Sequence, residues 1–528
     1  SPVHTWCIGL YRYSDHLHIG ADASDDCAER HQGLCEDGSD AKERLTDAET
    51  SGIQKDFMTG QILKYVFILT VILGTILVII TENRNPVKTL AWCVVLVFMP
   101  FIGFILYILF GMDNRHRRLI KKEEYDRLKG MTETIQKEDI VSEIPNRHKP
   151  LVTMLSKANG AYPLSGNNVE IMTDFTTMSD RLVSDIESAR HHINILFFKF
   201  EDDAAGNKIA DALIRKSKEG VQVRLIYDEA GNMMVPRRFY RRLRKHEIQV
   251  RGFIRIFLPI LSRDYNSRNH RKVVVIAGKV GYMGGMNIAQ RYAEGLKWGI
   301  WRDTHIRITG PAVSELQTSF LTDWKFTKGD TPNLDSLYPH NESCGKTLMQ
   351  VVTGGSMDRW NIMMQAYMTA IAGSRKYAYI QSPYFIPPEP LMRVLQNAAL
   401  SGVDVRVMIP YRGDKGILPP LASKSYIRDA LNAGIKIYFY RKGYMHAKTL
   451  VIDDCFVTIG STNIDFRGFE QDFEINAFMY DEDLACQQRD IFLQDQNDSQ
   501  LITLEEWETR PRLEKAMESV ARIFSQVL

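Results

Sequence analysis

Two long apolar runs stand out from an otherwise mixed pattern of hydrophobic and polar positions. They cover residues 65–80 and 89–111, and neither contains a charged side chain. A membrane-spanning helix needs about 20 apolar residues, so we expect two spans, at about 62–81 and 89–111, that form a hairpin. The alternatives are two buried core helices or a cleaved signal peptide. Uncharged runs this long are uncommon in soluble folds, and a second run argues against a signal peptide. Pro100 predicts a kink in the second span.

The segments that flank the hairpin differ in charge. A basic cluster opens the stretch 113–160, which we interpret as a juxtamembrane linker; its members are Arg115, Arg117, Arg118, Lys121 and Lys122. By the positive-inside rule this side of the membrane is cytoplasmic. The cluster is a plain topology anchor or also attracts anionic headgroups, by about 1 kcal/mol per residue. Residues 1–57 have more acidic than basic side chains and no sustained period, so we predict a poorly ordered extension that the chemistry does not need.

The rest of the chain contains an internal repeat. A β-branched stretch, an amphipathic stretch and a second β-branched stretch occur twice, and Gly220-Val221 matches Gly402-Val403 at an offset of 182 (402 − 220). Strand, helix and strand at this spacing predict a βαβ unit. We therefore expect an α/β fold with two pseudo-symmetric sandwich domains, at 161–335 and 336–528.

The repeat continues into residues whose side chains can take part in catalysis. His270 and Lys272 match His446 and Lys448 at an offset of 176 (446 − 270), and Asn287 matches Asn463 at the same offset. Each pair leads into a β-branched run, a tight return and a G-[GS]-x-N sequence. Residues i and i+2 of a strand share a face, so each histidine and its lysine are predicted to project together.

Two such copies facing one another would surround a single phosphate. One imidazole would attack phosphorus and the other would protonate the leaving oxygen. Both lysines, Asn287, Asn463 and Ser461 would hold the nonbridging oxygens. We expect no metal and no cofactor, because lysine supplies the positive charge and no GxxxxGK[ST] phosphate loop is present.

A carboxylate is needed to orient each imidazole. The candidates are Asp303, in WRDTH, and Glu474, in FEINAF. Each of them taken alone could be a structural ion pair, and each histidine taken alone could be a structural histidine. The matched pair of motifs favours catalysis.

Composition narrows the range of functions. Lys and Arg number 66 and Asp and Glu 64, so the net charge of +2 does not indicate a global field for nucleic acid. The seven cysteines form no CxxC pair, which argues against a zinc knuckle.

At these residues the chain resembles the phospholipase D superfamily, whose mark is H-x-K-x4-D-x6-G-[GS]-x-N in two copies. The second copy matches throughout, including Asp453, whereas the first has Ala277 at the acidic position. Position 277 lies seven residues after His270, and residues an odd number of positions apart on a strand point to opposite faces. We therefore expect the acidic position to be structural, although the motif includes it among the catalytic residues, and its loss to cost about 1–3 kcal/mol. The hairpin, with ENRNPVKTLAW, and the sequences SPYFIP and STNIDFRGFE look like the bacterial cardiolipin synthase branch.

That resemblance implies an inner-membrane enzyme that converts two phosphatidylglycerol molecules into cardiolipin and glycerol through a phosphohistidine. It implies His270 as nucleophile and His446 as general acid. Its partners would be phosphatidylglycerol, cardiolipin and the bilayer. The alternatives are a phospholipase, a phosphatidyltransferase with another alcohol, a non-catalytic lipid-binding homologue and, less in keeping with the hairpin, a nuclease. The sequence leaves the oligomeric state open.

Overall fold

The computed structural model describes residues 36–81, 86–111, 119–254, 267–330, 333–414 and 416–526. The chain divides into two units, Ser1–Phe104 and Ile105–Leu528. The phospholipase D-like chemistry predicted from the sequence falls entirely within the second unit.

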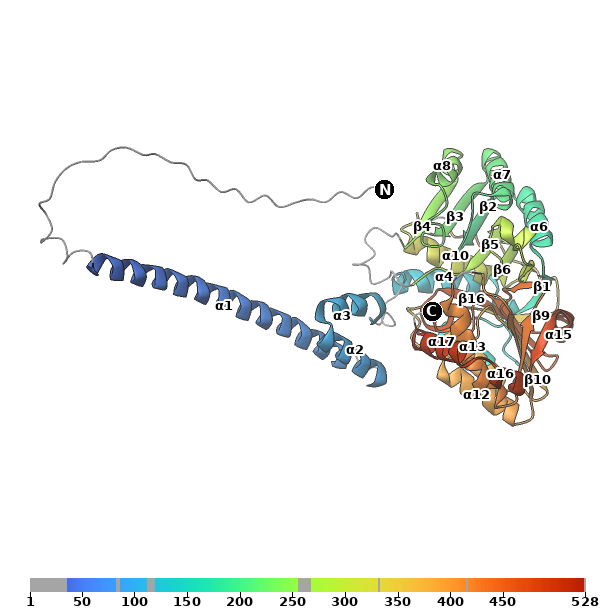
Figure 1. Ribbon diagram of the computed structural model, residues 1–528. Coiled ribbons are helices and arrows are strands. Elements are labelled where there is room, and N and C mark those ends of the chain that lie inside the picture. The colour runs from blue at the N-terminus through green and yellow to red at the C-terminus, as the bar shows by residue number, and fades with distance from the viewer. Residues whose placement is uncertain are drawn as a thin grey trace, which may run out of the picture. The chain divides into compact units, whose positions relative to one another are not determined.

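The N-terminal unit is built on one long helix, α1 (Glu36–Thr81), drawn in blue in Figure 1. Its segment Lys55–Thr81 has a mean hydropathy of 2.6, and among the described residues it is the one helix long and apolar enough to cross a membrane. The expected first span, 62–81, lies within it. The helix also continues back through residues 36–57, which differs from the expected disorder, because adding turns to an existing helix is cheap for residues such as Ala, Glu and Lys. Residues 1–35 lie outside the described residues.

The second apolar run is divided. Helix α2 (Pro86–Phe98) ends before Met99, and α3 (Pro100–Leu106) and a π-helical turn (Tyr107–Gly111) follow. The interruption falls where Pro100 was predicted to kink the run, since proline cannot donate the backbone hydrogen bond that a continuous helix needs. The second span therefore stays a prediction.

Residues expected to form a linker are instead partly folded onto the second unit. Helix α4 (Lys122–Ile135) buries Leu128 against a cluster that contains Trp324, and α5 (Lys149–Asn159) buries Leu155 in the core of the second repeat. A 3-10 turn, Lys137–Asp139, lies between them. Of the basic cluster, Lys121 and Lys122 are described, and the three arginines lie outside the described residues.

One sheet of fifteen strands organises the described part of the second unit. Its order is β17-β12-β11-β10-β14-β15-β16-β9-β1-β8-β6-β5-β2-β3-β4. In the first copy the strands are β1 (Leu164–Met172), β2 (His192–Phe197), β3 (Gln222–Asp228), β4 (Gln249–Phe253), β5 (Lys272–Ile276), β6 (Val280–Gly284) and β8 (His305–Thr309). In the second copy they are β9 (Thr347–Gly354), β10 (Tyr377–Gln381), β11 (Asp404–Pro410), β12 (Lys436–Tyr440), β14 (Thr449–Ile452), β15 (Phe456–Gly460), β16 (Glu474–Tyr480) and β17 (Ser499–Ile502). Read outward from the central β1–β9 pair, the two halves have the same order, with β17 added to the second.

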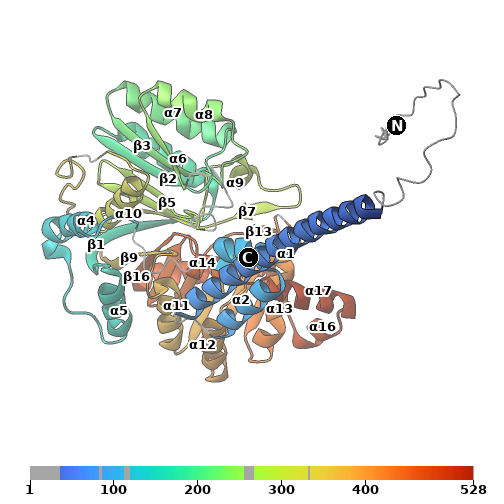
Figure 2. The same cartoon turned by 90° about the vertical axis from the view of Figure 1, so that its left-hand side faces the viewer.

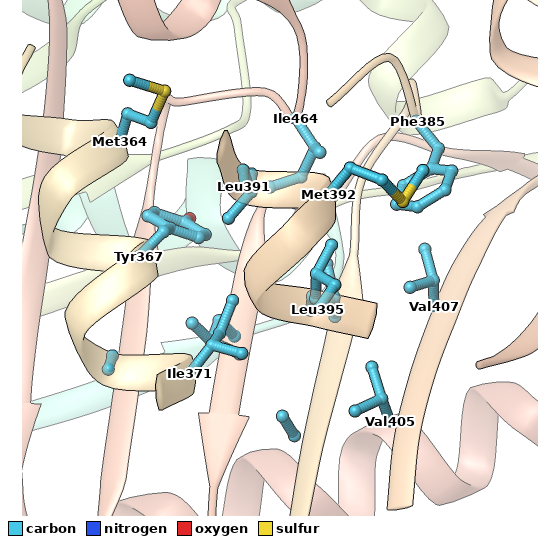
Figure 3. Close-up of a cluster of buried hydrophobic side chains, with 14 of the residues drawn as sticks. Met364, Tyr367, Ile371, Phe385, Leu391, Met392, Leu395, Val405, Val407 and Ile464 are labelled. Carbon is cyan, nitrogen blue, oxygen red and sulfur yellow. The ribbon is translucent and has the colours of Figure 1, made fainter. Parts of the chain in front are cut away.

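Helices cover this sheet, and Figure 2 shows α7 and α8 beside β2 and β3. Those of the first copy are α6 (Phe175–Ser188), α7 (Ala204–Lys218), α8 (Arg237–Lys245), α9 (Gln290–Glu294) and α10 (Val313–Phe326). Those of the second are α11 (Ile362–Ala372), α12 (Glu389–Leu400), α13 (Leu418–Leu431), α14 (Phe466–Glu470), α15 (Glu482–Asn497), α16 (Leu504–Glu508) and α17 (Arg512–Ile523). The side chains of α11 and α12, such as Tyr367 and Leu391, pack on the sheet in the core of the second copy (Figure 3). The α/β prediction is confirmed.

The register of the strands places both HxK pairs at equivalent strand ends. Strands β2 and β3 are parallel, as the βαβ prediction requires, and β5 runs antiparallel to β2 with Lys272 opposite Phe197. In the second copy β10 and β11 are parallel, and Gln381 of β10 lies opposite Thr449, the residue after Lys448. Each HxK pair therefore lies at the carboxyl end of the central parallel strands. A third hydrophobic cluster contains Val273 of β5 together with Val451 of β14, so the two halves share a core.

Candidate active site

Short backbone bridges join each HxK segment to the other copy. The backbone N–H of His270 donates to the carbonyl oxygen of Phe473 at 2.9 Å, and that of His446 donates to the carbonyl oxygen of Arg302 at 2.7 Å. The second bridge extends a small parallel pair, β7 (Ile300–Arg302) with β13 (Gly443–Met445). The two histidines are thus held where the two copies meet.

Each imidazole is oriented by a carboxylate from the opposite copy. Nδ1 of His270 lies 2.8 Å from Oε1 of Glu474 and 3.2 Å from the carbonyl oxygen of Ser461. Nδ1 of His446 lies 2.6 Å from Oδ2 of Asp303. Because both neighbours of His270 Nδ1 are acceptors, that nitrogen carries the proton and Nε2 is left as the reactive nitrogen. At His446, Nζ of Lys448 also lies 2.9 Å from Nδ1, beside the Asp303 carboxylate. Asp303 and Glu474, both predicted as orienting groups, are brought to the histidines in this crossed arrangement.

The two lysines are buried beside the histidines. Nζ of Lys272 donates to the carbonyl oxygen of His270 at 2.5 Å, and Nζ of Lys448 donates to that of His446. Burial lowers the pKa of Lys272 to about 7 and that of Lys448 to about 8, with attraction from Glu474 and Asp303 opposing the shift. A buried ammonium without a full counter-charge is costly, which suits it to receive an anion.

The electrostatic coupling extends across both copies. Burial lowers the pKa of His446, and the charges of Lys448, Lys272 and His270 lower it further. Burial raises the pKa of Glu474 to about 8, while Lys272 and Lys448 oppose that rise. The structure therefore brings both HxK pairs and both carboxylates into one site.

The G-[GS] position sets how each carboxylate is held. A Cβ on Gly285 would lie 2.1 Å from Oδ1 of Asp303, so only glycine leaves room for that carboxylate. At the matching position of the second copy, the hydroxyl of Ser461 donates to Oε2 of Glu474. Ser461 was predicted as a phosphate ligand, whereas its hydroxyl is here bonded to the orienting carboxylate.

The two asparagines differ in their surroundings. Both amide atoms of Asn287 have hydrogen-bond partners within the protein. Oδ1 accepts from the backbone N–H of Lys199 at 3.1 Å, and Nδ2 donates to the hydroxyl of Tyr292 at 2.7 Å. Among the described residues, Oδ1 of Asn463 has no hydrogen-bond partner. Asn463 also lines a cavity of about 310 Å³, whose other lining residues are Tyr384, Ile386, Pro419, Asp465, Arg467 and Asp472.

Asp453 lies apart from these groups. Its carboxylate accepts three backbone N–H groups, from Arg375, Lys376 and Tyr377, at 2.8–2.9 Å. It therefore ties the β14–β15 turn to the start of β10, at the end of β14 away from the histidine. Ala277 has the same left-handed backbone conformation (φ 52°, against 53° for Asp453) but no carboxylate.

Aromatic residues that the sequence did not point to surround the histidines. The rings of Tyr292, Trp301 and Tyr444 lie 5.8, 5.3 and 5.7 Å from that of His446, and the ring of Phe198 lies 5.0 Å from that of His270. Tyr444 stands two residues before His446, a spacing that could have suggested it.

Arg271, between His270 and Lys272, was also missed. Its guanidinium donates to Asp323 at 2.7 Å and to the carbonyl oxygen of Gly354 at 3.1 Å, which bridges the two copies. It lines a larger cavity, of about 600 Å³, that none of the predicted site residues reaches. Within the described parts of the chain, no group of three or more His, Cys, Asp or Glu side chains could hold a metal ion.

Two His–Lys pairs with buried lysines, each histidine oriented across a pseudo-symmetric α/β repeat, define a protein of the phospholipase D class. Residues 182–324 and 367–496 match the family described as "Cardiolipin synthase, PLD-like domain", and residues 69–111 match "Phospholipase_D-nuclease N-terminal". The chain belongs to the cardiolipin synthase family of phospholipase D-like proteins.

Individual relatives agree with this assignment. The chain is 39% identical over 487 residues to the major cardiolipin synthase ClsA of Bacillus subtilis (strain 168), covering 88% of this chain and 99% of the relative. It is 36% identical over 482 residues to a cardiolipin synthase of Listeria monocytogenes serotype 4a, covering 88% and 100%. A crystal structure of phosphatidylserine synthase from Haemophilus influenzae Rd KW20 has the same fold, with a TM-score of 0.56, 14% identity and coverage of 72% of this chain and 100% of that one. The relatives and the apolar helix α1 indicate a membrane protein.

Proposed function

We propose that this protein is a membrane-bound cardiolipin synthase that transfers a phosphatidyl group from one phosphatidylglycerol to another, with release of glycerol. The observation that carries the proposal is the crossed pair of dyads, His270–Glu474 and His446–Asp303, with Nδ1 of each ring held by a carboxylate. A phosphodiester exchange needs one nucleophile and one acid at the same phosphorus, and it needs no nucleotide.

The steps balance with these residues alone. Nε2 of His270 attacks phosphorus, the bond to the leaving glycerol oxygen breaks, and protonated His446 gives that oxygen its proton. His446 then takes the proton from the terminal hydroxyl of a second phosphatidylglycerol. The resulting oxygen attacks the phosphohistidine, which forms cardiolipin and frees His270. An anion between the lysines favours the protonated form of His446, so substrate binding prepares the acid.

Lys272 and Lys448 hold the nonbridging oxygens in this scheme, where the negative charge grows in the transition state. Asn463, whose Oδ1 has no hydrogen-bond partner among the described residues, lies beside the small polar cavity and is the asparagine better placed to contact substrate. Asn287 serves as a positioning residue through Lys199 and Tyr292.

The membrane arrangement is part of the proposal. Helix α1 would form the first span, the divided run 89–111 the second, and the basic stretch after it would keep the catalytic unit in the cytoplasm, at a bacterial inner membrane. Both substrates would then be supplied from the same bilayer.

The decisive experiment supplies labelled phosphatidylglycerol to the detergent-purified protein, without nucleotide or added metal, and separates the lipids. Cardiolipin and glycerol in equal amounts are expected. Phosphatidic acid as the sole product would show a phospholipase, and no turnover with intact lipid binding would show a non-catalytic homologue. His270→Ala and His446→Ala should each abolish turnover, while Leu400→Glu, an exposed change on α12, should not affect it.

A further inference from the structure

An exposed apolar loop lies at the same end of the strands as the site. Residues 229–236, here called the docking loop, follow the carboxyl end of β3, and the register of β2, β3 and β5 places that end beside Lys272. Met233 is 70% exposed and Met234 is 94% exposed. Such large apolar side chains, held next to one another in water, are a feature of surfaces that contact a membrane or a partner.

The base of the docking loop is firmly held, so the two methionines do not owe their exposure to a frayed end. Asn232 is buried, accepts from the backbone N–H of Phe200 at 2.8 Å and donates to the carbonyl oxygen of Phe198 at 2.7 Å. Asp228 accepts from Gly231 at 2.9 Å and from the backbone N–H of Asn269, which precedes His270, at 3.0 Å. The loop is thereby tied to the backbone that carries the first histidine.

A strongly basic helix begins where the docking loop ends. Six of the nine residues of α8 are basic and none is acidic: Arg237, Arg238, Arg241, Arg242, Arg244 and Lys245. The remaining residues, Phe239, Tyr240 and Leu243, are buried in the core of the first copy. The buried face fixes the helix. Five of its cations are exposed, whereas Arg242 is half-buried and donates to Oδ1 of Asn207 at 2.7 Å. Arg237 and Arg238 directly follow the docking loop.

The second copy has a related feature at its equivalent place. Ile417 and Leu418, at the start of α13 after the carboxyl end of β11, are 78% and 44% exposed. In both copies, therefore, apolar side chains are exposed beyond the carboxyl end of the second parallel strand, β3 or β11. The HxK pair of each copy lies at that same end of the sheet.

We propose that the docking loop and α8 bind the surface of an anionic bilayer, with Met233 and Met234 inserted between lipids and the cations of α8 on the phosphates. Apolar side chains beside a cluster of cations combine the two forces that hold proteins at such surfaces. Nucleic acid would use the cations but would leave the methionines in water. This inference rests on the proposed function, since it supplies the route by which phosphatidylglycerol reaches the two histidines.

The test uses the full chain carrying Met234→Cys, in nanodiscs of phosphatidylcholine alone or with an equal amount of phosphatidylglycerol. A membrane-impermeant maleimide labels the cysteines, and peptide mass spectrometry follows each site. Cys344 is exposed and serves as an internal reference on the same molecule. We expect labelling at position 234 to be at least about tenfold slower with phosphatidylglycerol, while Cys344 is labelled equally in both.

Charge reversal checks the role of α8. The pair Arg237→Glu and Arg241→Glu should restore fast labelling in the phosphatidylglycerol discs, and Arg393→Glu, an exposed arginine of α12, should not. Equal labelling of position 234 in the two kinds of disc would overturn the inference. So would slow labelling produced by double-stranded DNA and not by the anionic lipid.

A kinetic measurement separates this inference from the proposed function. For Met233→Glu with Met234→Glu, the ratio of turnover on bilayer phosphatidylglycerol to turnover on a monomeric short-chain analogue should fall about tenfold, and the Leu400→Glu ratio should not change. An unchanged ratio would overturn docking and leave the synthase proposal intact. No turnover by the unmodified protein on either substrate would instead remove the proposed function, and the labelling result would still decide docking.

Discussion

At the scale of single residues, the site depends on six ionisable groups that lie close together: two lysines, two histidines and two carboxyls. Lys272 and Lys448 lie next to two imidazoles and two carboxyls, and burial lowers the pKa of each lysine toward neutral pH. Burial of charge at this cost is typical of functional sites, because the substrate supplies the missing partner. The protonation of these two lysines therefore makes substrate binding depend on pH.

We expect the KM for phosphatidylglycerol to rise with pH. A lysine holds the phosphate only when protonated, and in the unliganded site its pKa is about 7 for Lys272 and about 8 for Lys448. As pH increases through these values the protonated fraction falls, so KM should increase by up to about tenfold per pH unit for each lysine. Initial rates against the surface concentration of lipid, at several pH values, measure this.

Lys272→Arg provides the matched comparison. The guanidinium stays protonated throughout this range, so its KM should vary less with pH even if kcat is low. A KM for the unmodified protein that stays flat above neutral pH would contradict the assigned role of the lysines.

The missing acid at position 277 gives a second prediction at this scale. Ala277→Asp should raise stability by about 1–3 kcal/mol, because aspartate tolerates the left-handed conformation and can accept backbone N–H groups at the start of β2, as Asp453 does at the start of β10. Thermal unfolding in detergent measures the change. Asp453→Ala should lower stability by a similar amount or more, and turnover of Ala277→Asp should stay close to that of the unmodified protein. A turnover that rises by orders of magnitude would show that the position belongs to the chemistry.

At the scale of elements, the residue that follows β6 or β15 determines which carboxylate can lie beside the histidine. Gly285 directly follows β6 and has no left-handed backbone conformation, so alanine there adds only bulk, directly against Asp303. The equivalent Ser461 fills the corresponding space and bonds to the longer Glu474. The choice of glycine or serine is thus coupled to the choice of aspartate or glutamate across the site.

Gly285→Ala should therefore lower kcat by about 10²–10⁴, since it displaces Asp303 and leaves His446 without its orienting partner. KM should change much less, because the lysines stay in place. Ser461→Gly is the matched change: it removes one hydrogen bond to Glu474 and should cost about tenfold or less. Steady-state kinetics with thermal unfolding as a folding check distinguish the two. Equal losses in both variants would show that the crowding at Asp303 is not what matters.

The repeat explains how far sequence reasoning could go at this scale. The offset between the motifs was enough to predict the βαβ units and the α/β fold, because these depend on neighbours along the chain. The crossed dyads join residues 143 and 204 positions apart, and no local pattern encodes such a contact. Tyr292 was missed because the repeat places Gly468 at its equivalent position (292 + 176), so it has no counterpart to draw attention to it. Helices α4 and α5 could have been predicted from their apolar spacing, but their basic and polar residues suggested a linker.

At the scale of the whole catalytic unit, neither copy is complete without the other. Each histidine takes its carboxylate from the opposite copy, the central strands β1 and β9 pair directly, and Arg271 bonds to groups of both copies. Helix α5, which precedes the first copy, lies in the core of the second. Asn159 at its end donates to the carbonyl oxygen of Thr353 in β9 at 2.8 Å.

A fragment of residues 336–528 should therefore fail to fold cooperatively. It loses α5, the edge contact with β1 and the shared core around Val451, and it exposes the inner face of its half of the sheet. Scanning calorimetry should find no sharp unfolding transition for the fragment. Co-expression with residues 36–335 should restore both the transition and turnover, because the missing contacts are non-covalent and the break falls outside the strands. A fragment that melted sharply by itself would mean that the second copy is an independent domain. The crossed dyads would then join two pre-formed halves, and the two copies would not form a single cooperative unit.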